Sequence, residues 1–192
     1  MASPPSAGTT PAKISQPPAY LRALHESAHI IAAIVFDFRY GDVTIKPNKR
    51  AGSFGEATVN CPLPDWKRGD GRRLILMERY LTGLYAGAAA MARHKRLTIS
   101  LKDAIQRDQK TGEFLIGEDR KQAARALVNF HFAKESRYID IDICTDYEQP
   151  MWRKARRFVA LHFAKIERLA AELTKRRTLK RNQINRILGI AN

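Results

Sequence analysis

Residues 19–36 read AYLRALHESAHIIAAIVF and contain the longest apolar run of the chain, Ile30 to Phe36. The large apolar side chains recur at the spacing of one helix face: Leu21, Leu24, Ile31, Ile34 and Val35. Pro17 and Pro18 lie directly before this stretch, where proline suits the first turn of a helix. The pattern therefore predicts a long, largely buried helix, around which the rest of the chain packs.

Residues 25–29 of this helix read His-Glu-Ser-Ala-His, an HExxH pattern. Positions i and i+4 lie on one helix face, so His25 and His29 can direct imidazole nitrogens at a single metal ion. Zinc lowers the pKa of a water bound to it, and Glu26 can take a proton from that water as it attacks a carbonyl. The pattern predicts a zinc peptidase site with two histidine ligands and Glu26 as the general base.

The alternative is that these three residues are ordinary members of a helix. An apolar helix disfavours this alternative, because buried polar side chains without partners are costly. Catalytic zinc normally takes three protein ligands. The spacing alone does not choose the third ligand among the many carboxylates and the three remaining histidines, His94, His131 and His162.

The remaining pattern predicts a mainly α fold with a small antiparallel β-sheet, an α+β class. Apolar and polar residues alternate between glycines and prolines in residues 40–64, which predicts two or three short strands. The second half of the helix expected over 72–94 is rich in small residues, which predicts that this helix is a central element. Helices are expected over 72–94, 118–132, 151–175 and 182–188, with a short helix and a loop in 98–116 and a connector in 139–150.

Residues 1–18 contain five prolines, three serines and two threonines and hardly any large apolar side chains. This composition is typical of a flexible tail. We expect residues 19–192 to form a single domain, whose last part, residues 151–192, consists of basic helices.

The formal net charge is +15, and the sequence pI is about 10.2. A surplus of this size attracts polyanions and acidic partners, but it does not determine the fold. Residues 152–186 carry twelve lysines and arginines against Glu167 and Glu172, a surplus of ten. Contact with nucleic acid or an acidic partner is one interpretation, and a solvated helix face is the favoured one.

The only cysteines, Cys61 and Cys144, are far apart and form no CxxC pair, which favours a reduced, cytoplasmic setting. The longest apolar run is about a third of the length that a membrane span requires, so we expect no membrane insertion. The oligomeric state stays open.

Four stretches resemble the zinc peptidase domain of the FtsH-type membrane-bound, ATP-dependent proteases. They are the HExxH helix with YLRA before it, GSFGEAT at 52–58, the small-residue stretch LTGLYAGAAAM at 81–91, and GEDRKQAA at 117–124. Residues 156–188 resemble the closing helices of that family. The resemblance covers residues 19–190 and implies a zincin-like helix bundle.

In the FtsH-type family an aspartate that opens a helix is the third zinc ligand. The resemblance assigns this role to Asp119, with Glu118 as the fallback one position earlier. The chain departs from the family at Ser27-Ala28, where the family favours Ala-Gly, and at Ala88 and Met91, where the family has arginine and glutamate.

The resemblance implies a zinc-dependent endopeptidase that acts on protein or peptide substrates. We expect a stand-alone relative of the family without an ATPase module, and therefore activity without ATP. The strand around residues 54–60 is either an edge that an extended substrate can join or a purely structural hairpin. The alternative is a catalytically silent or partner-specific regulatory protein of the same fold, whose basic C-terminal helices bind nucleic acid or an acidic partner.

Overall fold

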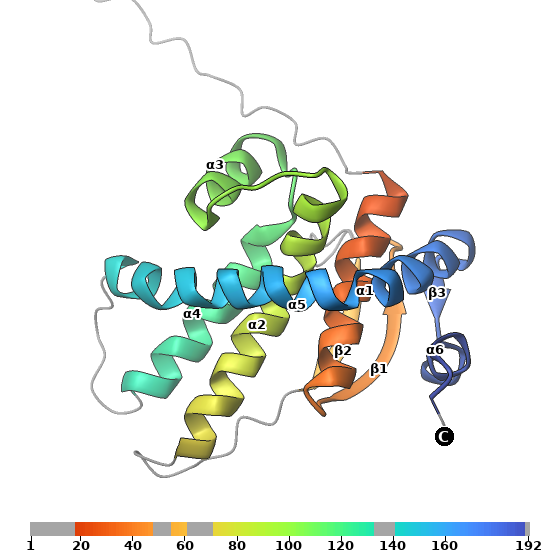
Figure 1. The fold of residues 1–192 in the computed structure, drawn as a ribbon, viewed down its shortest axis with the longest axis horizontal. Helices are drawn as coiled ribbons and strands as arrows, with labels where there is room; N and C mark the ends of the chain where they lie inside the picture. The colour runs from red at the N-terminus through yellow and green to blue at the C-terminus, as the bar shows by residue number, and fades with distance from the viewer. Residues whose placement is uncertain (1–17, 48–54, 61–70, 133–140, 191–192) are drawn as a thin grey trace, which may run out of the picture.

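The computed structural model describes residues 18–47, 55–60, 71–132 and 141–190. In these ranges the chain forms six helices and one small antiparallel sheet, which confirms the predicted α+β class (Figure 1). The expected flexible tail falls outside the described ranges except for Pro18, and Cys61 falls outside them as well.

Helix α1 (Ala19–Val35) begins directly after Pro18, which occupies the N-cap position. Its side chains from Arg22 to Ala33 are buried, apart from the half-buried His29. The helix packs against α2 and α5, and the Arg22 guanidinium donates a hydrogen bond to the Ile45 carbonyl at 3.0 Å. The long, buried helix predicted from the apolar spacing is therefore confirmed.

The sheet has the order β2-β1-β3, with β1 (Arg39–Thr44) in the centre and both pairs antiparallel. Strand β2 (Glu56–Asn60) comes from the predicted region, but β3 (Thr178–Leu179) comes from the far end of the chain. Within the described ranges β2 pairs only with β1, so it is an edge strand. Residue 54, the start of the predicted edge strand, lies outside these ranges.

Helix α2 (Gly71–His94) is a central element, as its small residues predict. It packs against α1, α4 and α5, and its alanines from Ala86 to Ala92 are at most 2% exposed. Helices α3 (Leu101–Thr111) and α4 (Ile116–Phe132) follow it in the chain. The predicted short helix in 98–116 and the helix at 118–132 are thus confirmed, the latter beginning two residues earlier.

Helix α5 (Ile141–Arg176) runs across α1 and α2 (Figure 1). The predicted connector at 139–150 is wrong from residue 141 onward, because the helix continues through Pro150. Proline removes one hydrogen bond inside a helix, but contacts on both sides hold this one in place. Glu148 is 1% exposed and accepts a hydrogen bond from the Tyr85 hydroxyl, while Trp152 is 1% exposed and donates to the Ile99 carbonyl.

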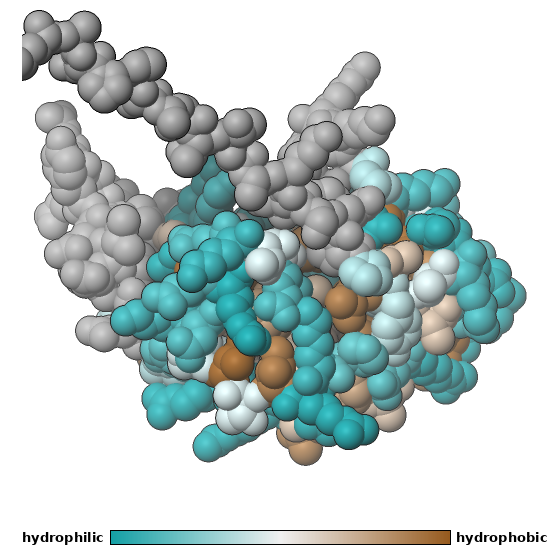
Figure 2. Space-filling model, turned by 90° about the horizontal axis from the view of Figure 1, so that it is seen from above, coloured by the Kyte–Doolittle hydropathy of each residue, from teal (hydrophilic) through white to brown (hydrophobic). Residues whose placement is uncertain are grey.

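Helix α6 (Arg181–Leu188) ends the described chain, as predicted, and Gly189 at φ 70° closes it. None of the helices in the described ranges combines the length and the apolar character that crossing a bilayer requires. Hydrophilic residues cover most of the coloured surface of the face in Figure 2, and the hydrophobic patches between them are small.

Candidate metal centre

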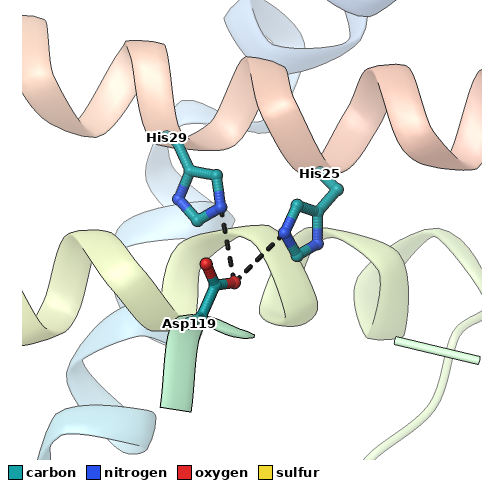
Figure 3. A group of neighbouring side chains, drawn as sticks. All are labelled: His25, His29 and Asp119. Carbon is teal, nitrogen blue, oxygen red and sulfur yellow. Dashed lines mark ion pairs between the residues drawn. The ribbon is translucent and has the colours of Figure 1, made fainter. Parts of the chain in front are cut away.

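Three side chains from two helices converge at one point beside α2 (Figure 3). His25 and His29 project from successive turns of α1, and Asp119 projects from the first turn of α4. The Asp119 Oδ2 atom lies 3.1 Å from Nε2 of His25 and 3.4 Å from Nε2 of His29. One potential ligand atom from each residue lies within 4.8 Å of the other two, so the group can hold a metal ion.

The buried carboxylate of Asp119 provides a test of that fit. Its Oδ2 atom is enclosed and close to both imidazoles, yet it has no hydrogen-bond partner among the described residues. Two imidazole nitrogens and a carboxylate oxygen around one point form a donor set that suits a catalytic zinc ion, with a fourth position left open. The three residues therefore fit a divalent metal ion.

The ring of His29 is oriented by the backbone of α2. Its Nδ1 atom lies 2.9 Å from the carbonyl oxygen of Gly83, and only a protonated Nδ1 can donate to that oxygen. The neutral ring therefore presents the lone pair of Nε2 to the other two side chains, as expected for a metal-ligating histidine.

Without a metal, the His29 imidazole and the Asp119 carboxylate stabilise each other's charged form. Burial favours the neutral imidazole, but the charge and hydrogen bonding of Asp119, the charge of Glu26 and the Gly83 carbonyl together outweigh this effect and raise the pKa of His29 to about 9. Burial likewise favours the neutral carboxyl, yet His29 and His25 hold the pKa of Asp119 well below its ordinary value. A metal ion must therefore displace a proton from His29 at neutral pH.

Gly87 of α2 provides the space for the ring of His25. A Cβ atom at Gly87 would lie 2.6 to 2.7 Å from three atoms of this ring, closer than real side chains approach. At Gly83, one turn earlier, a Cβ would meet only the Ala32 methyl at an ordinary 3.6 Å. The small-residue pattern predicts close helix packing, but sequence reasoning missed that Gly87 serves a histidine.

The general-base candidate Glu26 is 7% exposed and lies beside the two histidines. Gly55, just before β2, covers its carboxyl group, since a Cβ there would lie 2.6 Å from Oε1. Burial raises the pKa of Glu26, and the charges of His25 and His29 oppose this effect. A raised pKa suits a group that must first accept and then release a proton.

Asp108 holds the segment that presents Asp119. Its two carboxylate oxygens accept hydrogen bonds at 2.8 to 3.2 Å from four consecutive backbone N–H groups, those of Phe114, Leu115, Ile116 and Gly117. Leu115 adopts a φ of 55°, which non-glycine residues adopt only when their surroundings enforce it. Asp108 thereby caps the start of α4 and fixes where its first turn lies, a role that sequence reasoning missed.

The fallback ligand Glu118 is exposed and forms an ion pair with Lys121 at 3.2 Å. It borders the cleft, but it is not part of the group that converges on one point. The structure brings Asp119 to the histidines and leaves Glu118 facing solvent.

The three other histidines do not complete the group in the part of the chain that the structure describes. The His94 ring lies against Tyr20 at a centroid distance of 5.3 Å, and the His162 ring lies against Phe158 at 4.7 Å. The side chain of His131 lies outside the described residues.

A cleft of about 810 Å³ opens over the three side chains. Strand β2, the loop before α4 and the start of α4 all contribute residues to its walls. Residues lining the β2 side are Gly55, Glu56, Ala57 and Val59. The edge strand and the candidate metal centre therefore share one open cavity.

No protein-family model matches this chain, and a search of curated proteins finds no significant match. The geometry of the centre is consequently the main basis for an assignment of function.

Proposed function

We propose that the chain is a zinc-dependent endopeptidase that hydrolyses peptide bonds without ATP, with His25, His29 and Asp119 as ligands and Glu26 as the general base. The observation that carries the proposal is the convergence of the HExxH histidines with an aspartate ninety positions further along the chain, beside a buried glutamate. The resemblance of residues 19–190 to the FtsH-type peptidase domain supports the same assignment.

A zinc ion bound by the three ligands would supply a Lewis acid that polarises the substrate carbonyl and acidifies water. Glu26 takes the proton from the attacking water and delivers it to the nitrogen of the leaving amine. Its burial favours this exchange, because desolvation brings the pKa of the carboxyl nearer to neutrality. The backbone at Gly55 lies close against the carboxyl group and restricts its movement.

We infer that the substrate is an extended segment of polypeptide that joins the outer edge of β2. Residues of β2, whose outer edge has no pairing strand among the described residues, line the cleft, so a chain bound at that edge would pass over the metal ligands. Backbone hydrogen bonds to an edge strand give affinity with little demand on sequence. Unfolded or flexible proteins are therefore the proposed substrates, in the reduced cytoplasmic setting that the cysteine pattern favours.

The decisive experiment compares metal content and proteolysis in purified wild-type protein and Glu26→Gln. We expect the variant to retain stoichiometric zinc and lose at least about a hundredfold of its activity on casein, the scale typical of general-base catalysis. Ala replacements of His25, His29 and Asp119 should lose the metal. Undiminished casein cleavage by the glutamine variant would refute the assigned base, and inactive, metal-free wild type would favour the silent regulatory protein instead.

A further inference from the structure

A second cavity of about 900 Å³ lies between the C-terminal end of α2, the residues that follow it, and α5. It is strongly basic, and we call it the arginine groove. Five arginines line it, together with Phe163 and the single acid Glu167: Arg93, Arg96, Arg153, Arg156 and Arg157.

The five arginines have no carboxylate partner within the described ranges. Other cations of α5 do have acidic partners: Lys154 forms an ion pair with Glu78, and Arg176 forms one with Glu172. Like charges gathered in a concave site repel one another unless an anion joins them. Because Glu167 is the only acid among the described residues that line it, the arginine groove keeps a net positive charge.

The dipole of α2 accounts for only part of this arrangement. Cations near a helix C-terminus are stabilised by the last carbonyls, which applies to Arg93 in the last turn of α2. It does not apply to Arg153, Arg156 and Arg157, which lie in the middle of α5 and share one of its faces. The helix dipole therefore does not explain why arginines from two elements gather around one cavity.

We propose that the arginine groove binds the phosphate backbone of a nucleic acid. Arginine forms paired hydrogen bonds with phosphate oxygens, and a basic stripe on a chain of pI about 10.2 is the electrostatic pattern of nucleic-acid binding. The guanidinium of Arg93 lies over the ring of Phe163, 4.9 Å from its centre, and this contact holds the charged group at the groove.

This site is separate from the metal centre. On α2 the centre uses Gly83 and Gly87, whereas the arginine groove uses Ala89 and Arg93. Residues 87 and 89 lie about 200° apart around the helix axis, so the two sites occupy different faces of α2. The proposal consequently stands or falls independently of the peptidase activity.

The test is a salt titration of binding to a labelled oligonucleotide, followed by fluorescence anisotropy, with single-stranded and duplex probes of RNA and DNA. If the five arginines contact phosphates, the affinity for a single strand should fall about a hundredfold between about 50 and 200 mM salt, a logarithmic slope of about −3.5. The duplex probes tell whether the groove prefers one strand or two.

The variants Arg153→Gln/Arg157→Gln and Lys165→Gln/Arg168→Gln form a matched pair. Each removes two exposed charges from α5, but only the first pair lines the groove. We expect the groove variant to bind at least about tenfold more weakly with a slope smaller by about 1.4, and the control to stay within about twofold of wild type. Equal weakening in both variants, no binding at low salt, or displacement of the oligonucleotide by polyglutamate at equal charge would each overturn the proposal.

Discussion

Gly87→Ala tests whether the backbone of α2 shapes the metal centre. The added methyl would stand 2.6 to 2.7 Å from the ring of His25, where ordinary contacts begin near 3.4 Å, so the ring must move by about 1 Å. Overpacking of this kind costs about 1–3 kcal/mol, and the better helix propensity of alanine returns about 1 kcal/mol. We therefore expect a small net loss of stability but a shifted ligand.

The effect should appear chiefly in zinc binding. Disturbing the support of a metal ligand lowers metal affinity about 10- to 100-fold, and we expect a loss in this range for Gly87→Ala. A competitive titration against a chromophoric chelator at constant pH measures the dissociation constant, and thermal unfolding of the metal-free protein measures the stability.

Gly83→Ala is the matched control on the same helix. Its methyl meets only Ala32 at 3.6 Å, and its carbonyl remains available to His29. This variant should bind zinc as wild type does and gain up to about 1 kcal/mol of stability. The reasoning fails if Gly87→Ala keeps wild-type zinc affinity, or if both variants lose affinity equally.

Three further predictions concern stability and pH. Asp108→Asn should lower the unfolding free energy by about 1–3 kcal/mol and the zinc affinity about tenfold, because the amide offers one acceptor oxygen to four backbone N–H groups. Unchanged zinc affinity would show that the Asp108 cap does not position α4. Ser27→Ala should raise the unfolding free energy by about 1 kcal/mol, because the buried Ser27 hydroxyl has no hydrogen-bond partner among the described residues. Ser100→Ala should lower the unfolding free energy by about as much, because it removes the N-cap of α3. Urea titrations of both variants measure whether the two changes differ in sign. In metal-free protein the raised pKa of His29 stabilises the fold by on the order of 3 kcal/mol below pH 6.5, and this contribution disappears as the pH rises through about 9. The unfolding free energy of chelator-treated wild type should therefore exceed that of Asp119→Asn most near pH 5–6. A difference that persists at pH 10 would contradict the pairing of His29 with Asp119.

Local patterns predicted the parts of the fold that local sequence determines. The spacing of apolar residues predicted where α1 begins and ends. The HExxH motif identified both histidines, because positions i and i+4 share a helix face. Asp119 is ninety residues beyond His29, and no spacing rule connects the two. Only the family resemblance singled it out from the other carboxylates.

The remaining features depend on tertiary contacts that leave little trace in the sequence. Strand β3 has two residues, too few for an alternating pattern, and is held by pairing with Val43 and Thr44. Pro150 predicted a helix boundary, but the buried side chains on either side of it override that preference. Gly87 and Gly55 have a role only because a histidine and a glutamate from α1 rest against them.

The placement of the three ligands determines which helix a bound metal would protect from local unfolding. Two ligands belong to the buried first helix, and the third belongs to α4, which packs mainly on α2 and is anchored at its start by α3. A bound ion would therefore link α4 to α1 through their ligands. Removing it with a chelator should accelerate amide hydrogen exchange in α4 well before α1 or the middle of α2 responds.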